Sequence, residues 1–216
     1  MPSLLYKIYK SNDLWRVDTL ENDIYLTFDD GPIPEVTPWV LDLLDTYNAK
    51  ATFFCVGDNV QKHHAIFDDI VQRVHSVGNH TFNHLNGWKS NPKDYILNVK
   101  KCSKSFPSSL FRPPYGKTSY SERKFLKKYY QFVYWTVVSG DFDKTLSPEK
   151  CLEKTIASTE KGAIVVFHDS LKAKENLQYV LPAFLAHFSN LGFQFKAIPY
   201  HLQGAKHPLE QIKTAS

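Results

Sequence analysis

Short apolar runs alternate with amphipathic segments along most of the chain. The runs are rich in β-branched and aromatic residues, which is typical of buried strands, and they lie at 24–28, 51–56, 76–80, 110–112, 131–137, 163–167 and 193–198. The segments between them space apolar residues as helices do, at about 37–47, 64–77, 92–105, 121–130, 148–160 and 177–191. This alternation predicts a parallel α/β fold. About seven strands at this spacing favour a single-domain, distorted or incomplete (β/α) barrel over an open sheet.

Polar residues follow the ends of several of these apolar runs. They are Asp29 with Asp30, His80, the segment 112–115, Asp141, and His168 with Asp169. In a (β/α) barrel the carboxyl ends of the strands converge on one face, where active sites are built. The fold prediction therefore gathers residues that are scattered in the sequence into one candidate site.

The segment Thr27–Pro32 places two adjacent carboxylates directly after an apolar strand. Asp, Gly and Pro all favour turns, so a plain turn is one interpretation. The other interpretation is a division of labour between the two carboxylates. Neighbouring side chains on extended backbone diverge, so one carboxylate can bind a metal ion while the other faces a substrate.

The segment His80–His84 has a histidine at each end, four residues apart. On a helical turn such residues share a face and can bind one ion, although many isolated pairs of this kind are surface residues. Two histidines and one aspartate would leave coordination positions open for water and substrate, as catalytic sites do. This ligand set suits Zn²⁺, and Co²⁺, Ni²⁺, Mn²⁺ or Fe²⁺ could also occupy it.

Four segments in this order, Thr27–Pro32, His80–His84, Arg112–Gly116 and Val166–Asp169, resemble the motifs of the polysaccharide deacetylase family. This family is also known as the NodB homology domain or carbohydrate esterase family four. The resemblance extends over nearly the whole chain. It implies a NodB-like barrel that uses one divalent metal ion, most simply Zn²⁺, to remove N-acetyl groups from glycans. The substrate class would be N-acetylglucosamine-containing peptidoglycan or chitin oligomers.

The resemblance divides the chain into three parts. The catalytic domain is predicted at 24–198, after an N-terminal leader segment at 1–23 and before a polar tail at 199–216.

The resemblance also implies a metal site and an acid–base pair. Asp30, His80 and His84 match the metal ligands, and Asp29 matches the general base that activates the attacking water. His168 matches the general acid that protonates the leaving amine. Amide hydrolysis needs these parts, since a metal ion can lower the pKa of water from 15.7 to about 7. A histidine with an ordinary pKa of about 6.5 suits the acid role.

Four further residues match supporting roles in the family. Arg112 matches the arginine that pairs with the base, and a nearby cation favours the charged form of a carboxylate. Asp141 matches the aspartate that orients the catalytic histidine, and the backbone N–H of Tyr115 matches the oxyanion donor. Thr81 matches a hydroxyl residue that supports the metal loop.

A substrate groove completes what the resemblance implies. Its residues would be Pro113, Pro114, Tyr115, Phe142 and Val166, the last near the acetyl methyl group. The sequence departs from the family at Phe142, where a tryptophan is usual, and at Val138, where the family has a further aspartate. We interpret both as changes in the groove and not in the chemistry. We expect Trp135 to pack in the core or at the rim and not to bind sugar, and for Trp88 both interpretations stay open.

Composition narrows the function classes. Apolar residues make up 43% and charged residues 22% of the chain, as in ordinary soluble domains. The net charge of +4 comes without a dense Lys/Arg block, so we expect no nucleic-acid partner. The three cysteines are an odd and scattered set, which argues against a disulfide framework.

The sequence also bears on membranes and location. No apolar run approaches the ~20 residues that span a membrane, and lysines interrupt the N-terminal region before a signal-peptide core forms. We therefore expect no membrane span, a monomer and a cytoplasmic location, although a cell-wall substrate would require export.

Three other functions stay open at this point. An O-acetyl esterase acting on a xylan-like glycan, or a cyclic-imide amidohydrolase, would use the same site. A non-catalytic glycan-binding module is the third, but a module that had lost catalysis would be expected to lack a ligand, the base or the acid. This chain has a candidate for each, which favours an enzyme.

Overall fold

A single curved sheet of parallel strands organises the computed structural model, which describes residues 13–198. Seven strands follow the order β5-β4-β3-β2-β1-β7-β6, and β8 pairs with β1. The strands are β1 (Asp23–Asp29), β2 (Thr52–Cys55), β3 (Ser76–Asn79), β4 (Leu110–Phe111), β5 (Gln131–Phe132), β6 (Val137–Val138), β7 (Ile164–His168) and β8 (Gln194–Lys196). All of their pairings are parallel, as the strand–helix alternation predicted.

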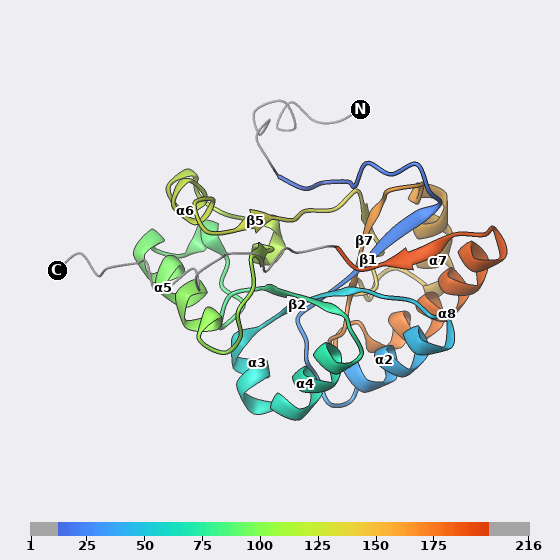
Figure 1. Ribbon diagram of the computed structural model, residues 1–216, viewed down its shortest axis with the longest axis horizontal. Helices are drawn as coiled ribbons and strands as arrows, with labels where there is room; N and C mark the ends of the chain where they lie inside the picture. Colours follow the sequence, from blue (N-terminus) through green and yellow to red (C-terminus); the bar gives the residue numbers. More distant parts are fainter. Residues whose placement is uncertain (1–12, 199–216) are drawn as a thin grey trace.

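Helices form an arc around the outside of the sheet, with α5 and α6 at one end and α7 and α8 at the other (Figure 1). They are α2 (Thr37–Thr46), α3 (Gly57–Lys62), α4 (His64–Gln72), α5 (Pro92–Ser103), α6 (Tyr120–Leu126), α7 (Pro148–Ser158) and α8 (Lys174–Asn190), with 3₁₀ turns η1 (Gly87–Lys89) and η2 (Pro114–Gly116). Proline lies in the first turn of α2, α5 and α7, where its missing N–H leaves no bond unmade.

The connection between β5 and β6 explains why the sheet curls. These strands lie at opposite edges of the seven-strand path, yet only residues 133–136 join Phe132 to Val137. Such a link spans at most about 18 Å, whereas the outer strands of a flat seven-stranded sheet lie about 29 Å apart. The two edges must therefore approach each other, and the predicted incomplete barrel is confirmed. The run at 131–137, predicted as one strand, contains both edge strands.

Strand β1 shows how the two faces of the sheet differ. Leu26 and Phe28 point outward into the large core beneath the helices. Thr27 and Asp29 alternate with them and point to the inside of the barrel, where both contact Arg112. The inner face therefore becomes polar at the carboxyl end of the strand, which is where the site lies.

Some predicted helix limits were wrong. The helix predicted at about 64–77 ends at Gln72, because Val74 takes a left-handed conformation (φ 61°) that turns the chain into β3. Helix α3 was not predicted, and α8 begins at Lys174 instead of 177. Within residues 13–198, no helix has both the length and the apolar character required to cross a membrane. The tail predicted at 199–216 lies outside the described residues.

Candidate active site

The end of β1 separates two neighbouring carboxylates. Asp29 is 5% exposed, and its Oδ1 accepts a hydrogen bond from Arg112 Nη1 at 2.7 Å. Asp30 follows in a left-handed conformation (φ 86°), which turns its side chain away from that of Asp29. Asp30 Oδ1 lies 3.1 Å from His84 Nε2 and 3.8 Å from His80 Nε2. This geometry fits the interpretation that the two carboxylates have separate tasks.

The segment His80–His84 is a loop, so the helical turn assumed for it was wrong. Thr81 (φ 63°) and His84 (φ 55°) both adopt the left-handed region, which breaks any helical path. The loop nevertheless brings the two imidazole rings to a centroid distance of 5.1 Å. The Thr81 hydroxyl accepts a hydrogen bond from Leu85 N at 3.1 Å, consistent with a supporting role in this loop.

Two asparagines that the sequence did not reveal hold this loop in shape. Asn79 Oδ1 accepts a hydrogen bond from Thr81 N at 2.9 Å. Asn98, on α5, accepts from the backbone N–H groups of Phe82 and Asn83 at 2.8 and 3.0 Å. These bonds satisfy backbone donors that have no helical partner, which stabilises an otherwise strained conformation. Asn79 directly precedes His80, but nothing in the sequence pattern connected Asn98 with the site.

His80 is prepared to act as a ligand. Its Nδ1 donates to the backbone oxygen of Arg112 at 2.7 Å, which leaves the lone pair on Nε2 facing Asp30. The residue is 1% exposed, and burial lowers the pKa of His80 to about 4. The imidazole is therefore neutral at pH 7, as metal coordination requires.

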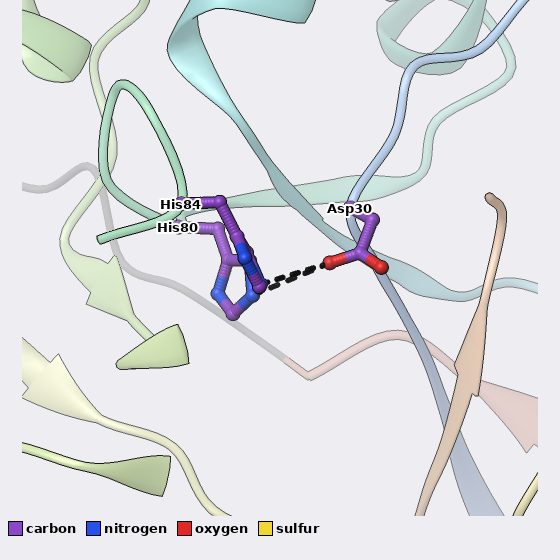
Figure 2. Close-up of side chains that lie close together, drawn as sticks. All are labelled: Asp30, His80 and His84. Carbon is purple, nitrogen blue, oxygen red and sulfur yellow. Dashed lines mark ion pairs between the residues drawn. The ribbon is translucent and has the colours of Figure 1, made fainter. Parts of the chain in front are cut away.

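Asp30, His80 and His84 together fit a metal ion (Figure 2). One potential ligand atom from each lies within 4.8 Å of the other two. Among residues 13–198, no donor meets the buried Asp30 Oδ1 in hydrogen-bond geometry, so this oxygen is open to a cation. Burial disfavours the charged form of Asp30, but contact with His84 and the nearby imidazoles outweighs it and holds the pKa of Asp30 below its ordinary value. The donor set leaves room for water and substrate on the same ion.

The end of β7 carries a third histidine, His168, in a different environment. Asp141 makes two contacts with His168. Its Oδ2 accepts a hydrogen bond from the backbone N–H of His168 at 2.7 Å, and its Oδ1 lies 2.8 Å from the ring Nδ1. Burial alone would lower the pKa of His168, but the charge and hydrogen bond of Asp141 outweigh it and raise that pKa to about 9. The ring is therefore protonated at pH 7. Phe142 packs edge-on against it, with a centroid distance of 4.9 Å.

Arg112 links the base to the barrel wall. The residue is completely buried, and its guanidinium donates to Asp29 Oδ1 and Thr27 Oγ1 at 2.7 and 2.8 Å. It also donates to the backbone oxygens of Val133 and Tyr134 at 3.2 and 3.0 Å, in the connection between β5 and β6. A buried guanidinium with four acceptors is a fixed positive charge beside the Asp29 carboxylate.

The residues assigned to the groove lie around the same end of the barrel. Pro113–Pro114 is buried, whereas Tyr115 is 60% exposed and has a left-handed backbone (φ 60°). The Tyr115 ring packs edge-on against His84, with a centroid distance of 4.8 Å. Val166 is 2% exposed and shares a strand face with His168, two residues along β7. The roles assigned to these side chains stay predictions.

Asp169 is a site residue whose part the sequence did not indicate. It is fully buried and holds the turn after β1. Its carboxylate accepts from Gly31 N at 3.0 Å and from the Thr37 hydroxyl at 2.6 Å, and its own N–H donates to the oxygen of Asp29 at 3.1 Å. These bonds bracket Asp30 on both sides. A Cβ at Gly31 would lie 1.9 Å from an Asp169 oxygen, so only glycine fits there.

A candidate metal triad thus lies beside a carboxylate paired with arginine and a protonated imidazole. Asp29 and His168 are direct register partners on β1 and β7, so the candidate base and the candidate acid are adjacent at the carboxyl end of the sheet. These groups, at the carboxyl ends of the strands of a parallel barrel, are those that a metal-dependent hydrolase uses.

Comparisons with known proteins identify the kind of hydrolase. The family model for polysaccharide deacetylase matches residues 16–131. A peptidoglycan-N-acetylglucosamine deacetylase from Bacillus cereus is 34% identical over 193 residues, which cover 85% of this chain and 90% of that protein. A chitooligosaccharide deacetylase from Azorhizobium caulinodans is 29% identical over 207 residues, covering 85% and 96% of the two chains.

The fold agrees with this similarity. The crystal structure of the Bc1960 peptidoglycan N-acetylglucosamine deacetylase matches with a TM-score of 0.80 and 26% identity, over 91% of this chain and 95% of that one. The chain belongs to the polysaccharide deacetylase family, as its ordered motifs predicted, and it is a hydrolase of that family.

Proposed function

We propose that this protein removes N-acetyl groups from N-acetylglucosamine units of peptidoglycan or chitin oligomers, with one divalent metal ion held by Asp30, His80 and His84. The observation that carries the proposal is the register pairing of Asp29 with His168 beside the three candidate ligands. The similarity to deacetylases named for peptidoglycan N-acetylglucosamine and for chitooligosaccharides supports the substrate class.

Asp29 is the base in this proposal. A divalent ion in the site, when bound, would activate the attacking water and polarise the acetyl carbonyl. Asp29 accepts the proton of that water on the carboxylate oxygen that Arg112 does not use, since Arg112 Nη1 bonds to Oδ1. Arg112 fixes the plane of the carboxylate, because its other donors are tied to the barrel wall.

His168 is the acid. Its ring carries a proton at pH 7, because Asp141 raises the pKa of His168 to about 9. With Nδ1 occupied by Asp141, the Nε2–H is the group that passes a proton to the leaving nitrogen. The backbone N–H of Tyr115 donates to the developing oxyanion, and Val166 forms an apolar contact for the acetyl methyl group.

Acetate release after metal removal and metal return tests the proposal. The purified protein is analysed for metal, stripped with a chelator, reloaded with Zn²⁺ or Co²⁺, and assayed on chitin oligomers, peptidoglycan and acetylated xylan. We expect acetate from the N-acetylated glycans only when metal is present, and none from an Asp29→Asn variant that still binds metal. Faster release from acetylated xylan would indicate an O-acetyl esterase, and glycan binding without any release would indicate a non-catalytic module.

A further inference from the structure

Trp88 combines exposure with a fixed orientation. Its side chain is 66% exposed, although indole is among the largest apolar groups in proteins. The indole Nε1 donates to the backbone oxygen of Thr118 at 3.1 Å, and the backbone N–H donates to Asn86 Oδ1 at 3.0 Å. The ring is therefore held in place at the surface, and burial in the core does not account for its position.

The position of Trp88 relates it to the catalytic end of the barrel. Turn η1, which carries Trp88, follows the loop of His84, and four residues span at most about 14 Å. The indole is bonded to Thr118, three residues beyond Tyr115, whose ring packs against His84. Trp88 and Tyr115 are thus exposed aromatic residues on two segments that are tied to each other and to the metal-ligand loop.

A rigid aromatic surface beside a catalytic site suits one kind of contact with a sugar. The faces of a pyranose ring carry C–H groups, which pack against the face of an indole. Because Trp88 is already ordered, binding costs little further conformational entropy. The ammonium of Lys117 lies over one face of the indole, 5.0 Å from the ring centre, so a sugar would stack on the other face.

We propose that Trp88 forms a sugar-binding subsite that stacks on a pyranose ring next to the N-acetylglucosamine unit being deacetylated. This inference rests on the proposed function and specifies its substrate as a chain of several sugars. Contact energy at the neighbouring ring would anchor the reacting unit, so longer oligomers would be better substrates than single amino sugars.

Substrate length provides the test. We would measure kcat/KM of the metal-loaded enzyme on chitotetraose and on monomeric N-acetylglucosamine, for wild type, Trp88→Ala and Trp88→Phe. The matched control is Tyr179→Ala, since Tyr179 is an aromatic residue of 47% exposure on α8 and supplies no group to the site. Melting temperatures verify that each variant is folded.

We expect Trp88→Ala to lose most of the wild-type preference for the tetramer. The KM for chitotetraose should rise several-fold, and kcat/KM for the monomer should stay unchanged. Trp88→Phe should keep part of the preference, and Tyr179→Ala all of it. An unchanged tetramer-to-monomer ratio in Trp88→Ala, with active wild type, would overturn the subsite alone. Absence of acetate release by wild type from every oligomer would overturn the proposed function, and the subsite with it.

Discussion

The carboxyl ends of β3 and β7 present two histidines in opposite states. At the end of β3, His80 Nδ1 donates to a backbone carbonyl, and burial lowers the pKa of this histidine to about 4. At the end of β7, His168 Nδ1 meets the carboxylate of Asp141, which overcomes burial and raises the pKa to about 9. One ring is neutral at pH 7 and the other is protonated.

The group that Nδ1 contacts therefore determines what each ring can do. A neutral carbonyl fixes the tautomer of His80 without adding charge, so Nε2 presents a lone pair suitable for a metal ion. At His168 a carboxylate also accepts a hydrogen bond from Nδ1, but its negative charge stabilises the positive charge of the ring, so Nε2 carries a proton as well. Two histidines of one site thus differ in protonation because their Nδ1 atoms contact different groups.

The largest effect on activity is expected from loss of a candidate metal ligand. Replacing His80 by alanine should abolish stoichiometric metal binding and activity, because Asp30 and His84 alone do not complete a catalytic site. Elemental analysis of the purified variant measures this. His75→Ala is a matched control, since His75 is also buried with a pKa lowered to about 4 by burial and is not among the three candidate ligands. Full metal content in His80→Ala would remove this residue from the ligand set.

For His168, the proposed acid, we expect a substitution to reduce turnover without loss of bound metal. His168→Ala removes the proton donor for the leaving nitrogen, and kcat should fall by about 10²–10⁴. Metal content should equal that of wild type, because His168 is not among the candidate ligands. Exposed His187 on α8 provides a control replacement with no expected change in kcat. If both histidine variants turned over substrate at the same rate, His168 would not be the acid.

A smaller effect is expected for the turn that positions Asp30. Asp169→Ala removes the acceptor for Gly31 N and for the Thr37 hydroxyl, so the turn loses its anchor on one side of Asp30. Metal affinity should weaken by about 10–100-fold, as measured by calorimetric titration of the stripped protein. Thr37→Val removes the bond to Asp169 and the one from Ile33 N but keeps the Gly31 bond beside Asp30, so it should cause a smaller loss. Equal affinity in wild type and Asp169→Ala would show that the turn needs no such anchor.

The sequence predicted the barrel, and which candidate residues it brings together, for a physical reason. Strand periodicity and polar residues at strand ends are local features, and a parallel barrel brings strand ends together whatever the loops do. The separation of Asp29 from Asp30 was expected from extended backbone, but it arises from the left-handed conformation of Asp30. Site residues on or next to the strands β1, β3, β4 and β7 were therefore accessible to prediction.

The features of the site that the sequence did not predict depend on contacts between segments that are distant in the chain. A spacing of four residues looks the same on a helix and on a left-handed loop, so the loop of His80–His84 was misinterpreted as a helical turn. Its anchor Asn98 lies on α5, and the partners of Asp169 lie in the turn after β1 and in α2. No periodicity records such pairings, because they arise only when the sheet places those elements side by side.

The pH dependence of catalysis offers the finest test of the contrast between the histidines. The proposed acid is the protonated form of His168, so kcat of wild type should fall as pH rises through about 9. Asp141→Asn removes the negative charge, and the fall in kcat at alkaline pH should move down by about 1–3 pH units.

The free energy of unfolding should depend on pH in the same direction. The pKa of His168 is about 9 in the folded protein and about 6.5 when unfolded, so its contribution to stability is complete below pH 6.5 and is lost as pH rises towards 9. Urea unfolding at pH 6 and pH 9 should therefore show a larger pH effect in wild type than in the variant. An alkaline limb at the same pH in both proteins would mean that Asp141 does not set the protonation state of His168, and the difference from His80 would then need another cause.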